Sequence, residues 1–279
     1  MILRLDFGVL GLFEVDLPGV TEDDHAAIRG ILERRINSRE KSRDVLADAF
    51  LCALERCPCA NPSDVWHHLL YRDYLELKVG TNPNQSWVRT SGEAFENVVA
   101  ETYNPFLVPE GIRLVPLFSK KDKGRLLERM GLRDQIGSEK IDLAIESRDS
   151  RVGVEDGWGV VGGIHAKVSL AERVSDDVPA SRLMMAAGFS SILSTLDVKS
   201  FPPPHGDLVN RGELGEPNRP TDKRDYVERH GEFSVCISHN LRTTPSPSET
   251  PSGRTILVSG LGAQIKQTDA FLQFLQREG

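Results

Sequence analysis

Long apolar runs, a cysteine framework and an excess of positive charge are all missing from this sequence. No stretch approaches the ~18 consecutive apolar residues of a membrane-spanning helix, and Arg4 and Asp6 interrupt the segment where a signal peptide would carry its apolar core. Acidic residues outnumber basic ones by 41 to 34. This balance argues against a protein that coats nucleic acid electrostatically, but it allows a clamp whose basic residues line one cleft. We expect a globular cytoplasmic protein without a membrane partner.

Cysteine is rare, and its spacing does not suit a structural zinc site. Cys52, Cys57 and Cys59 lie close together, whereas Cys236 lies far along the chain. Structural zinc sites usually combine paired C-x2-4-C elements. Cys52 falls within an apolar helical pattern, and Cys57-Pro58-Cys59 is typical of the turn that ends it. A zinc site completed by a nearby histidine is the alternative, but the spacing favours free buried thiols.

The first eighty residues show apolar side chains at helical spacing. We predict three helices that begin at Thr21, near Ser42 and near Ser63, and we expect them to form one helical layer. His67 and His68 fall on the third helix beside aromatic residues, where packing or a local hydrogen bond is more common than catalysis.

Beyond residue 84, short strand-like runs alternate with helical patterns. A helix is expected to start at Ser91, and the stretches 202–222 and 243–254, rich in Pro, Gly, Ser and charge, are expected to be loops. The apolar runs that predict strands are 112–118, 141–145, 160–168 and 191–198, with helices near 125–130 and 178–187. The pattern predicts an α/β or α+β protein with a mixed central β-sheet flanked by helices.

A glycine-rich segment at 157–162 matches the pattern G-x-G-x-x-G. The dinucleotide-binding form of this motif follows a strand and opens a helix. Here the segment precedes a strand, so a glycine-rich turn that leads into a buried strand is favoured.

Asp142 and Lys167 each interrupt an apolar strand-like segment. Because side chains alternate between the two faces of a strand, adjacent strands would bring these two residues together at one edge of the sheet. A carboxylate that holds a divalent cation, beside a lysine, can promote hydrolysis of a phosphodiester bond. The alternatives are a structural ion pair and an exposed rim.

Further carboxylates strengthen this hypothesis. Glu96 is expected on the early turns of a helix, and Asp176 and Asp177 at the start of the helix that follows Lys167. Acidic residues also favour the first turn of any helix. Together with Asp142, however, they would repel one another unless a hard cation such as Mg²⁺ lay among them.

Several long segments of this chain closely resemble type II restriction endonucleases of the group that cuts palindromes containing CCGG. They are Gly162–Ser181 (GGIHAKVSLAERVSDDVPAS), Leu196–Asp207 (LDVKSFPPPHGD), Gln85–Glu96 (QSWVRTSGEAFE), Asn210–Leu214 and Trp66–His68. The resemblance covers most of the chain, and these strings are far more specific than the Asp and Lys pattern alone. It implies a restriction-endonuclease-like core of the PD-(D/E)XK superfamily.

The resemblance also assigns the catalytic residues. It implies that Asp142 and Lys167 form the centre of the PD-(D/E)XK site and that Glu96 supports it. The usual proline before the aspartate is Ile141 here, and the usual acid two residues before the lysine is His165, a poor ligand for Mg²⁺. In this group the second metal-binding acid comes from the next helix. Asp177 is the candidate, with Asp176 and Glu172 as alternatives, so Asp142 and Asp177 are the expected metal ligands.

Glu172 and Arg173 are candidates for reading DNA sequence. Arginine can donate two hydrogen bonds to guanine, and a carboxylate can accept one from cytosine, so the pair suits a C·G base pair. A surface ion pair is the alternative. Arg89, with Gln85 and Trp87, is a further candidate for the minor groove or the outer bases.

Together these features predict a Mg²⁺-dependent endonuclease that cuts double-stranded DNA at a palindrome containing CCGG, with ACCGGT as a candidate for the full site, and leaves 5′-phosphate ends. A palindrome requires two-fold symmetry, so we expect a homodimer on DNA, even if the free protein is a monomer. A structure-specific repair or recombination nuclease and an inactive DNA-binding relative are the alternatives. We expect one domain over 1–279, with a helical layer at 1–80 and the catalytic and DNA-recognition core at 85–260.

Overall fold

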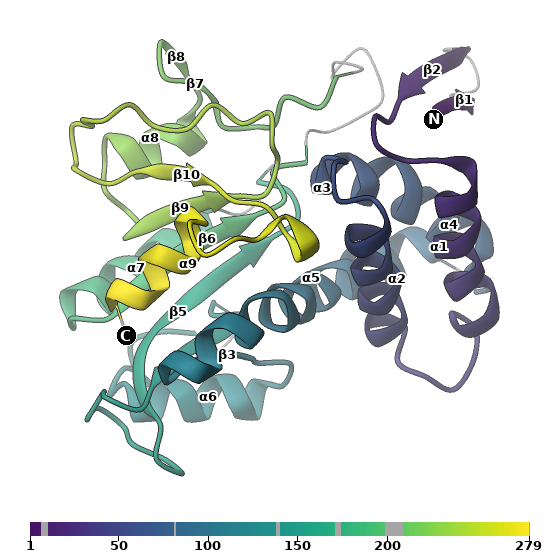
Figure 1. Cartoon of the computed structure of the whole chain (residues 1–279). Coiled ribbons are helices and arrows are strands. Elements are labelled where there is room, and N and C mark those ends of the chain that lie inside the picture. The colour runs from purple at the N-terminus through teal and green to yellow at the C-terminus, as the bar shows by residue number, and fades with distance from the viewer. Residues whose placement is uncertain (7–10, 81, 138–139, 171–173, 199–208, 279) are drawn as a thin grey trace.

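A computed structural model describes residues 1–6, 11–80, 82–137, 140–170, 174–198 and 209–278. A mixed sheet of six strands lies between helices, and a layer of helices from the N-terminal part of the chain packs beside it (Figure 1). This arrangement confirms the predicted mixed sheet flanked by helices.

The helical layer contains α1 (Glu22–Arg35), α2 (Ser42–Arg56), α3 (Pro62–Asp64), the π-helix η2 (Val65–Leu70) and α4 (Tyr71–Leu77). Thr21 caps α1, since its hydroxyl accepts a hydrogen bond from the backbone N–H of Asp24 while the Asp24 carboxylate accepts one from the Thr21 backbone. The predicted start of the first helix is thus confirmed. Ser42 is the first residue of α2 and not its cap. The capping position is occupied by Lys41, whose side chain makes no hydrogen bond to the first turn.

The longest helix, α5, spans Pro83–Leu107. The prediction that a helix starts at Ser91 is wrong, because Asn82 caps the helix by accepting a hydrogen bond from the backbone N–H of Gln85 at 3.0 Å. Pro83 fits the first turn, where its missing N–H would have no partner in any case. Glu96 therefore lies in the middle of α5 and not on its early turns.

The sheet has the strand order β10-β9-β6-β5-β4-β3. Neighbours among β3, β4 and β5 are antiparallel, whereas β5, β6, β9 and β10 run parallel. The strands are β3 (Ile112–Pro116), β4 (Leu143–Ser147), β5 (Gly159–Lys167), β6 (Ser190–Thr195), β9 (Val235–Ser238) and β10 (Ile256–Val258). The four predicted strands are all present, and the glycine-rich segment 157–162 turns into β5, as expected.

Helices cover both faces of the sheet. Helices α5 and α9 (Ala270–Glu278) pack on one face, where Leu143 and Ile192 join their apolar core. Helices α6 (Lys120–Arg129), α7 (Val174–Ala186) and α8 (Asp222–Glu228) pack on the other, against Ala144 and Leu193. Neighbouring residues of one strand thus point into different cores, as strand alternation requires.

Two small hairpins and two short helices complete the described elements. The first hairpin pairs β1 (Ile2–Asp6) with β2 (Leu12–Asp16), and the second pairs β7 (Gly215–Glu216) with β8 (Arg219–Pro220). The 3-10 helices are η3 (Val108–Glu110) and η4 (Gly262–Gln264). Neither hairpin was expected from the sequence pattern. The strands of the first have five residues each, and those of the second have two.

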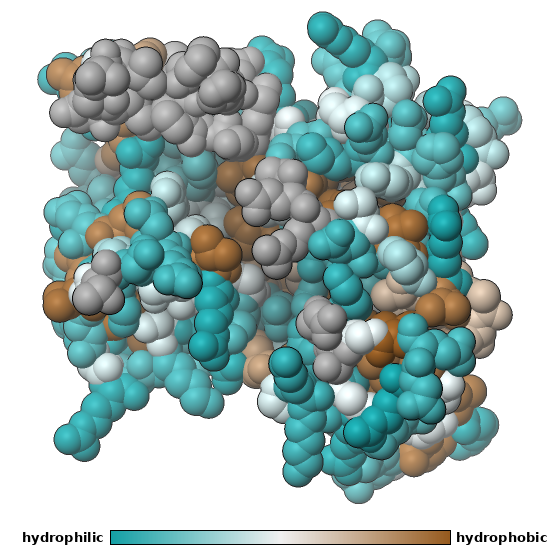
Figure 2. All heavy atoms as spheres, turned by 180° about the vertical axis from the view of Figure 1, so that it is seen from behind, coloured by the Kyte–Doolittle hydropathy of each residue, from teal (hydrophilic) through white to brown (hydrophobic). Residues whose placement is uncertain are grey.

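One continuous apolar core joins the helical layer to the sheet, since it contains Ile28 and Phe50 as well as Ile145 and Ile237. Seen from behind, most of the surface is hydrophilic, and the face is hollowed near its middle, where hydrophobic residues are visible (Figure 2). No helix among the described residues is long and apolar enough to span a membrane.

All four cysteines are free thiols. Cys57 and Cys236 are buried and Cys52 is partly buried, but Cys59 is exposed, so the expectation of buried thiols is wrong for Cys59. Burial raises the pKa of the Cys57 thiol to about 11. The turn predicted at Cys57 is confirmed, because α2 ends at Arg56.

Candidate active site

Asp142 and Lys167 meet where β4 begins and β5 ends. The two strands are antiparallel neighbours, with Leu143 opposite Ile164. The Asp142 carboxylate accepts hydrogen bonds at its Oδ2 from the backbone N–H of Ala166 at 3.0 Å and from Nζ of Lys167 at 3.2 Å. The structure therefore brings together the two residues that the strand pattern placed at one edge.

Asp177 approaches the same lysine from α7. Its Oδ2 lies 3.0 Å from Nζ of Lys167, and the residue is only 3% exposed. Asp176 is exposed instead. Val174, Val178 and Ser181 are buried on α7, and their spacing places position 177 on the inward face. That spacing is a signal in the sequence that distinguishes Asp177 from Asp176.

Glu96 reaches the site from α5, on the opposite side of the sheet. Its carboxylate is buried, and its Oε2 has no hydrogen-bond partner among the described residues. Burial, and then repulsion by Asp142, raise the pKa of Glu96 to about 8. Glu96 is therefore protonated at neutral pH as long as no cation compensates its charge.

Lys123 of α6 also belongs to the site, although no pattern in the sequence pointed to it. Its Nζ lies 2.9 Å from Oδ1 of Asp142, so each oxygen of that carboxylate faces a lysine. Burial alone would raise the pKa of Asp142, but Lys167 and Lys123 hold it below its usual value. Lys123 lies in the run Lys120-Lys121-Asp122-Lys123. The sequence could not predict its contact with Asp142, because no periodic spacing connects the two residues.

Burial disfavours the charge of Lys167, but its two carboxylate partners outweigh that effect. Asp142 and Asp177 together raise the pKa of Lys167 above its ordinary value. The lysine is therefore a fixed positive charge at neutral pH, and it can orient a nucleophile or stabilise a negative charge that develops during a reaction.

Glu96, Asp142 and Lys167 open onto a cleft of about 390 Å³. It is lined by Trp87, Val88, Ser91, Gly92, Glu96, Asp142, Ala166, Lys167, Val168 and Ser169. An unpartnered carboxylate oxygen beside a second, ionised carboxylate suits a hard divalent cation. Among the described residues, no three His, Cys, Asp or Glu side chains are already arranged to hold a metal ion.

His165 takes no part in this carboxylate group. Its ring is fully buried, and Nε2 lies 3.0 Å from the hydroxyl of Ser191, while the edge of the ring meets Phe233. Burial lowers the pKa of His165, so the imidazole is neutral. These contacts indicate a packing role at the position where many related nucleases carry an acid.

The candidates for DNA reading have different positions. Glu172 and Arg173 lie outside the described residues. Arg89 lies on the exposed side of α5, where its side chain is 85% exposed and its Nε lies 3.3 Å from Glu93. It therefore faces a neighbouring groove and not the catalytic cleft.

His67 and His68 of the helical layer are packed residues, as the sequence favoured. His67 stacks on Tyr71 and meets His68 edge to face. Burial lowers the pKa of His67 to about 4 and that of His68 to about 3, so both are neutral.

Comparison with known proteins identifies the family of this chain. The chain is 58% identical to the type II restriction enzyme AgeI of Thalassovita gelatinovora over 277 residues, which is 99% of this chain and 98% of that protein. This chain belongs to the type II restriction endonucleases. A crystal structure of specific restriction endonuclease AgeI in complex with DNA superimposes with a TM-score of 0.93 and 56% identity, covering 100% of this chain and 99% of the other. Residues 118–253 match the family "BsaWI restriction endonuclease type 2".

Membership in this family confirms the main function predicted from the sequence. The protein is a DNA-binding, site-specific deoxyribonuclease that hydrolyses phosphodiester bonds. Enzymes of this family generally use a divalent metal ion. The matched segment 118–253 contains Lys123, Asp142, Lys167 and Asp177.

Proposed function

We propose that this enzyme cuts both strands of a palindrome that contains CCGG, with ACCGGT as the candidate for the full site, and that it uses Mg²⁺ and leaves 5′-phosphate ends. The resemblance of segments 162–181 and 196–207 to endonucleases that cut CCGG sites supports the target. We also propose that residues 1–279 act as one domain, which the shared apolar core supports.

The observation that carries the proposed active site is the position of Lys167 between Asp142 and Asp177, at 3.2 and 3.0 Å, with an unpartnered oxygen of Glu96 beside them. Buried charged groups are normally satisfied by partners, so an incomplete group in a cleft indicates that a ligand completes it. A cation and a DNA phosphate would supply the missing partners.

In the proposed mechanism, Asp142 and Asp177 would hold the cation, and Glu96 would support them from α5. The bound Mg²⁺ would lower the pKa of water and stabilise charge on phosphate oxygens. Asp142 is already ionised, because Lys123 and Lys167 lower its pKa. Lys167 orients the attacking water or stabilises the charge that develops on phosphate. Attack on phosphorus in line with the leaving 3′-oxygen yields a 5′-phosphate and a 3′-hydroxyl.

DNA reading is proposed for Glu172 and Arg173, which follow the lysine strand directly in the sequence. Arg173 would donate to guanine and Glu172 would accept from cytosine in the major groove. Arg89 is proposed as a DNA contact outside the catalytic cleft. Because a palindrome presents the same half-site twice, two copies of the chain would act on one site.

Digestion of a sequenced plasmid with Mg²⁺, followed by mapping of the ends, tests this proposal. We expect one sharp consensus centred on CCGG and 5′-phosphate ends at every cut. Cuts at a different consensus would overturn the proposed target. Cuts that follow DNA structure would point to a repair nuclease, and binding without cleavage would identify an inactive relative.

A further inference from the structure

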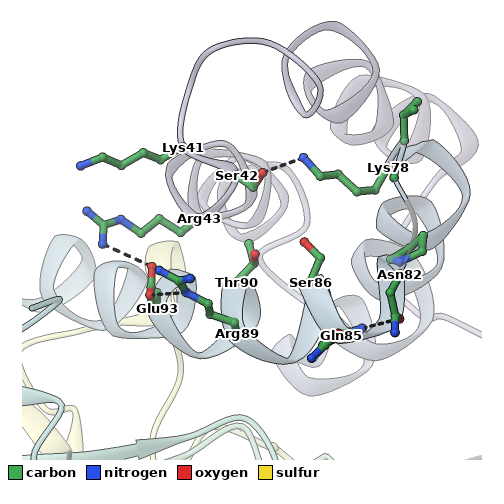
Figure 3. A pocket seen from close by; sticks show the side chains of 13 residues that line it. Lys41, Ser42, Arg43, Lys78, Asn82, Gln85, Ser86, Arg89, Thr90 and Glu93 are labelled. Atoms are coloured by element: carbon green, nitrogen blue, oxygen red, sulfur yellow. Dashed lines mark hydrogen bonds and ion pairs between the residues drawn. The ribbon is translucent and has the colours of Figure 1, made fainter.

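A second, larger groove lies on the other side of α5. It has a volume of about 830 Å³ and runs between the start of α2, the connection after α4 and the first turns of α5 (Figure 3). Its walls carry Lys41 and Arg43 at the start of α2, Lys78 after α4, and Gln85, Arg89 and Glu93 on α5. None of the catalytic carboxylates lines it.

The groove is basic although the protein is acidic. Four cationic side chains line it, namely Lys41, Arg43, Lys78 and Arg89, against a single acidic one, Glu93. The formal balance is four minus one, or +3, on a chain whose net charge is −7. Such a local concentration of positive charge attracts a polyanion even when the whole protein is negative.

Internal ion pairs neutralise only part of this charge. Arg43 and Arg89 share Glu93, each at 3.3 Å (Figure 3), and Arg43 also pairs with Asp44 at 3.1 Å. Four cationic side chains against these two carboxylates leave four minus two, or +2. Lys78 donates hydrogen bonds to the backbone oxygen of Ile36 and the hydroxyl of Ser42, both neutral groups. Lys41 is exposed, so its ammonium group is open to a ligand. The groove therefore keeps a net positive charge when these contacts are all in place.

Two helices also begin at this groove. Helix α2 starts at Ser42 and α5 at Pro83, and both Ser42 and Pro83 line the groove. Lys41, which precedes α2, makes no side-chain cap bond to the first turn. The positive ends of the two helix dipoles therefore add to the charge of the four cationic side chains.

Helix α5 connects the groove to the active site. Gln85, Arg89 and Glu93 face the groove, whereas Trp87 and Glu96 face the catalytic cleft. At 1.5 Å per residue, Gln85 lies ~16 Å along the helix from Glu96. That length corresponds to roughly five base pairs at 3.4 Å each, which is more than half of a six-base-pair site. A duplex that runs along α5 from the cleft would therefore reach the groove beyond the end of its target.

We propose that this groove binds the phosphate backbone of duplex DNA that flanks the recognition site. The proposal rests on the proposed function, because it places the target at the cleft beside Glu96. The cationic groups come from three separate segments and do not converge on one point, which suits a series of phosphates better than one small anion (Figure 3). Contacts of this kind position the protein on DNA without reading sequence.

Binding to duplexes of two lengths tests the proposal. One duplex ends at the edges of the target, and the other carries about ten base pairs on each side. Wild type, Lys41→Gln, Arg89→Gln and the double variant are compared in chelator, so that the DNA stays intact. Arg277→Gln, which removes an exposed charge on α9, is the matched control.

We expect each groove substitution to weaken binding of the long duplex by about tenfold in low salt and to lower the salt slope by about one. The loss should be the same for cognate and random flanked sequences, whereas Lys41→Gln should bind the short duplex as wild type does. The control should match wild type on both.

Equal losses on short and long duplexes would overturn the proposal, as would no loss on either. A loss confined to the cognate sequence would also overturn it and would make Arg89 a base contact. These outcomes are independent of the plasmid digest, which tests the cleavage site and not the flanks. A failed target assignment therefore remains distinguishable from a failed groove.

Discussion

Two groups of buried charged side chains, one around Arg224 and one around Lys167, differ in how completely their members are paired. Arg224 is fully buried on α8, where its guanidinium donates to the carboxylate of Glu228 at 2.5 Å. It also donates to the backbone oxygens of Leu214, Gly215 and Thr244. These hydrogen bonds connect α8 to the β7–β8 hairpin and to the loop that begins at Thr243.

The group around Lys167 has more charged side chains, and one of them is not fully paired. Asp142, Asp177 and Glu96 face one another across two lysines, yet Oε2 of Glu96 has no partner among the described residues. A structural group is complete without a ligand, whereas a catalytic group leaves places for one. The unpartnered oxygen in the group around Lys167 therefore indicates where a metal ion and DNA would bind.

The largest effects are expected at the centre of the second group. Lys167→Ala and Asp142→Ala should each abolish cleavage, because the first removes the fixed positive charge and the second an expected metal ligand. Both proteins should stay folded and bind the target, and Lys167→Ala should bind at least as well as wild type. Binding by Asp142→Ala should depend less on Mg²⁺, since no carboxylate remains there to repel phosphate.

Gel-shift and cleavage assays on one cognate duplex measure both properties. Circular dichroism provides the control for folding. Cleavage by either variant near the wild-type rate would contradict the assignment of the active site.

The next largest loss of cleavage is expected for a substitution at Asp177, and only a small loss for one at His165. Asp177→Asn keeps the shape of the side chain but removes its charge, so we expect the single-turnover rate at saturating Mg²⁺ to fall by orders of magnitude. His165→Ser should keep substantial activity, because the buried imidazole contacts Ser191 and Phe233 and not the carboxylates. The reverse ranking would make histidine a proton-transfer group and would exclude Asp177 as the second metal acid.

Arg224 provides the corresponding test of the structural group. Arg224→Met leaves the buried Glu228 without its charged partner, and we expect a loss of ~3–5 kcal/mol in the free energy of unfolding. Replacing both residues by apolar ones should recover part of it. Arg229→Gln is the matched control, since Arg229 is exposed and lies 3.8 Å from Asp225. Urea unfolding measures all of these variants, and equal losses for Arg224→Met and Arg229→Gln would contradict the comparison.

The sequence predicted those parts of the molecule that depend on local pattern. Strand alternation predicted that Asp142 and Lys167 would meet at one edge of the sheet. They do meet, because β4 and β5 are antiparallel neighbours, although Asp142 lies one residue before β4. Capping chemistry was sufficient at Thr21. The capping pattern at Ser91 was misleading, because α5 begins earlier, with Asn82 as its cap and Pro83 as its first residue. A helix can continue through Ser91 and Gly92 when one of its faces is buried.

Other features depend on tertiary structure and could not be predicted from one sequence. Lys123 meets Asp142 only because α6 packs on the same face of the sheet as α7. Glu96 meets Asp142 from the other face, at the end of the strands where the two layers approach one another. No spacing in the sequence relates these residues, since the contact depends on how whole helices pack.

The smallest predicted effect concerns the pH dependence of stability in the metal-free protein. The pKa of Glu96 is about 8 in the folded chain and lies near 4.5 when the chain unfolds. Between these values the folded state binds more protons than the unfolded state, so the contribution of Glu96 to stability falls as pH rises from about 5 to 8. Glu96→Gln should remove this part of the decrease.

Thermal unfolding in chelator, at intervals from pH 5 to 8.5, measures this difference. The Tm of wild type should fall more steeply than that of Glu96→Gln, and the two curves should converge at the acidic end, where both side chains are neutral. Added Mg²⁺ should flatten the wild-type curve, because a cation beside the carboxylate favours its ionised form. Parallel curves for the two proteins would mean that the Glu96 carboxylate does not lack a partner, just as Glu228 does not. The difference in pairing between the two groups would then not include Glu96.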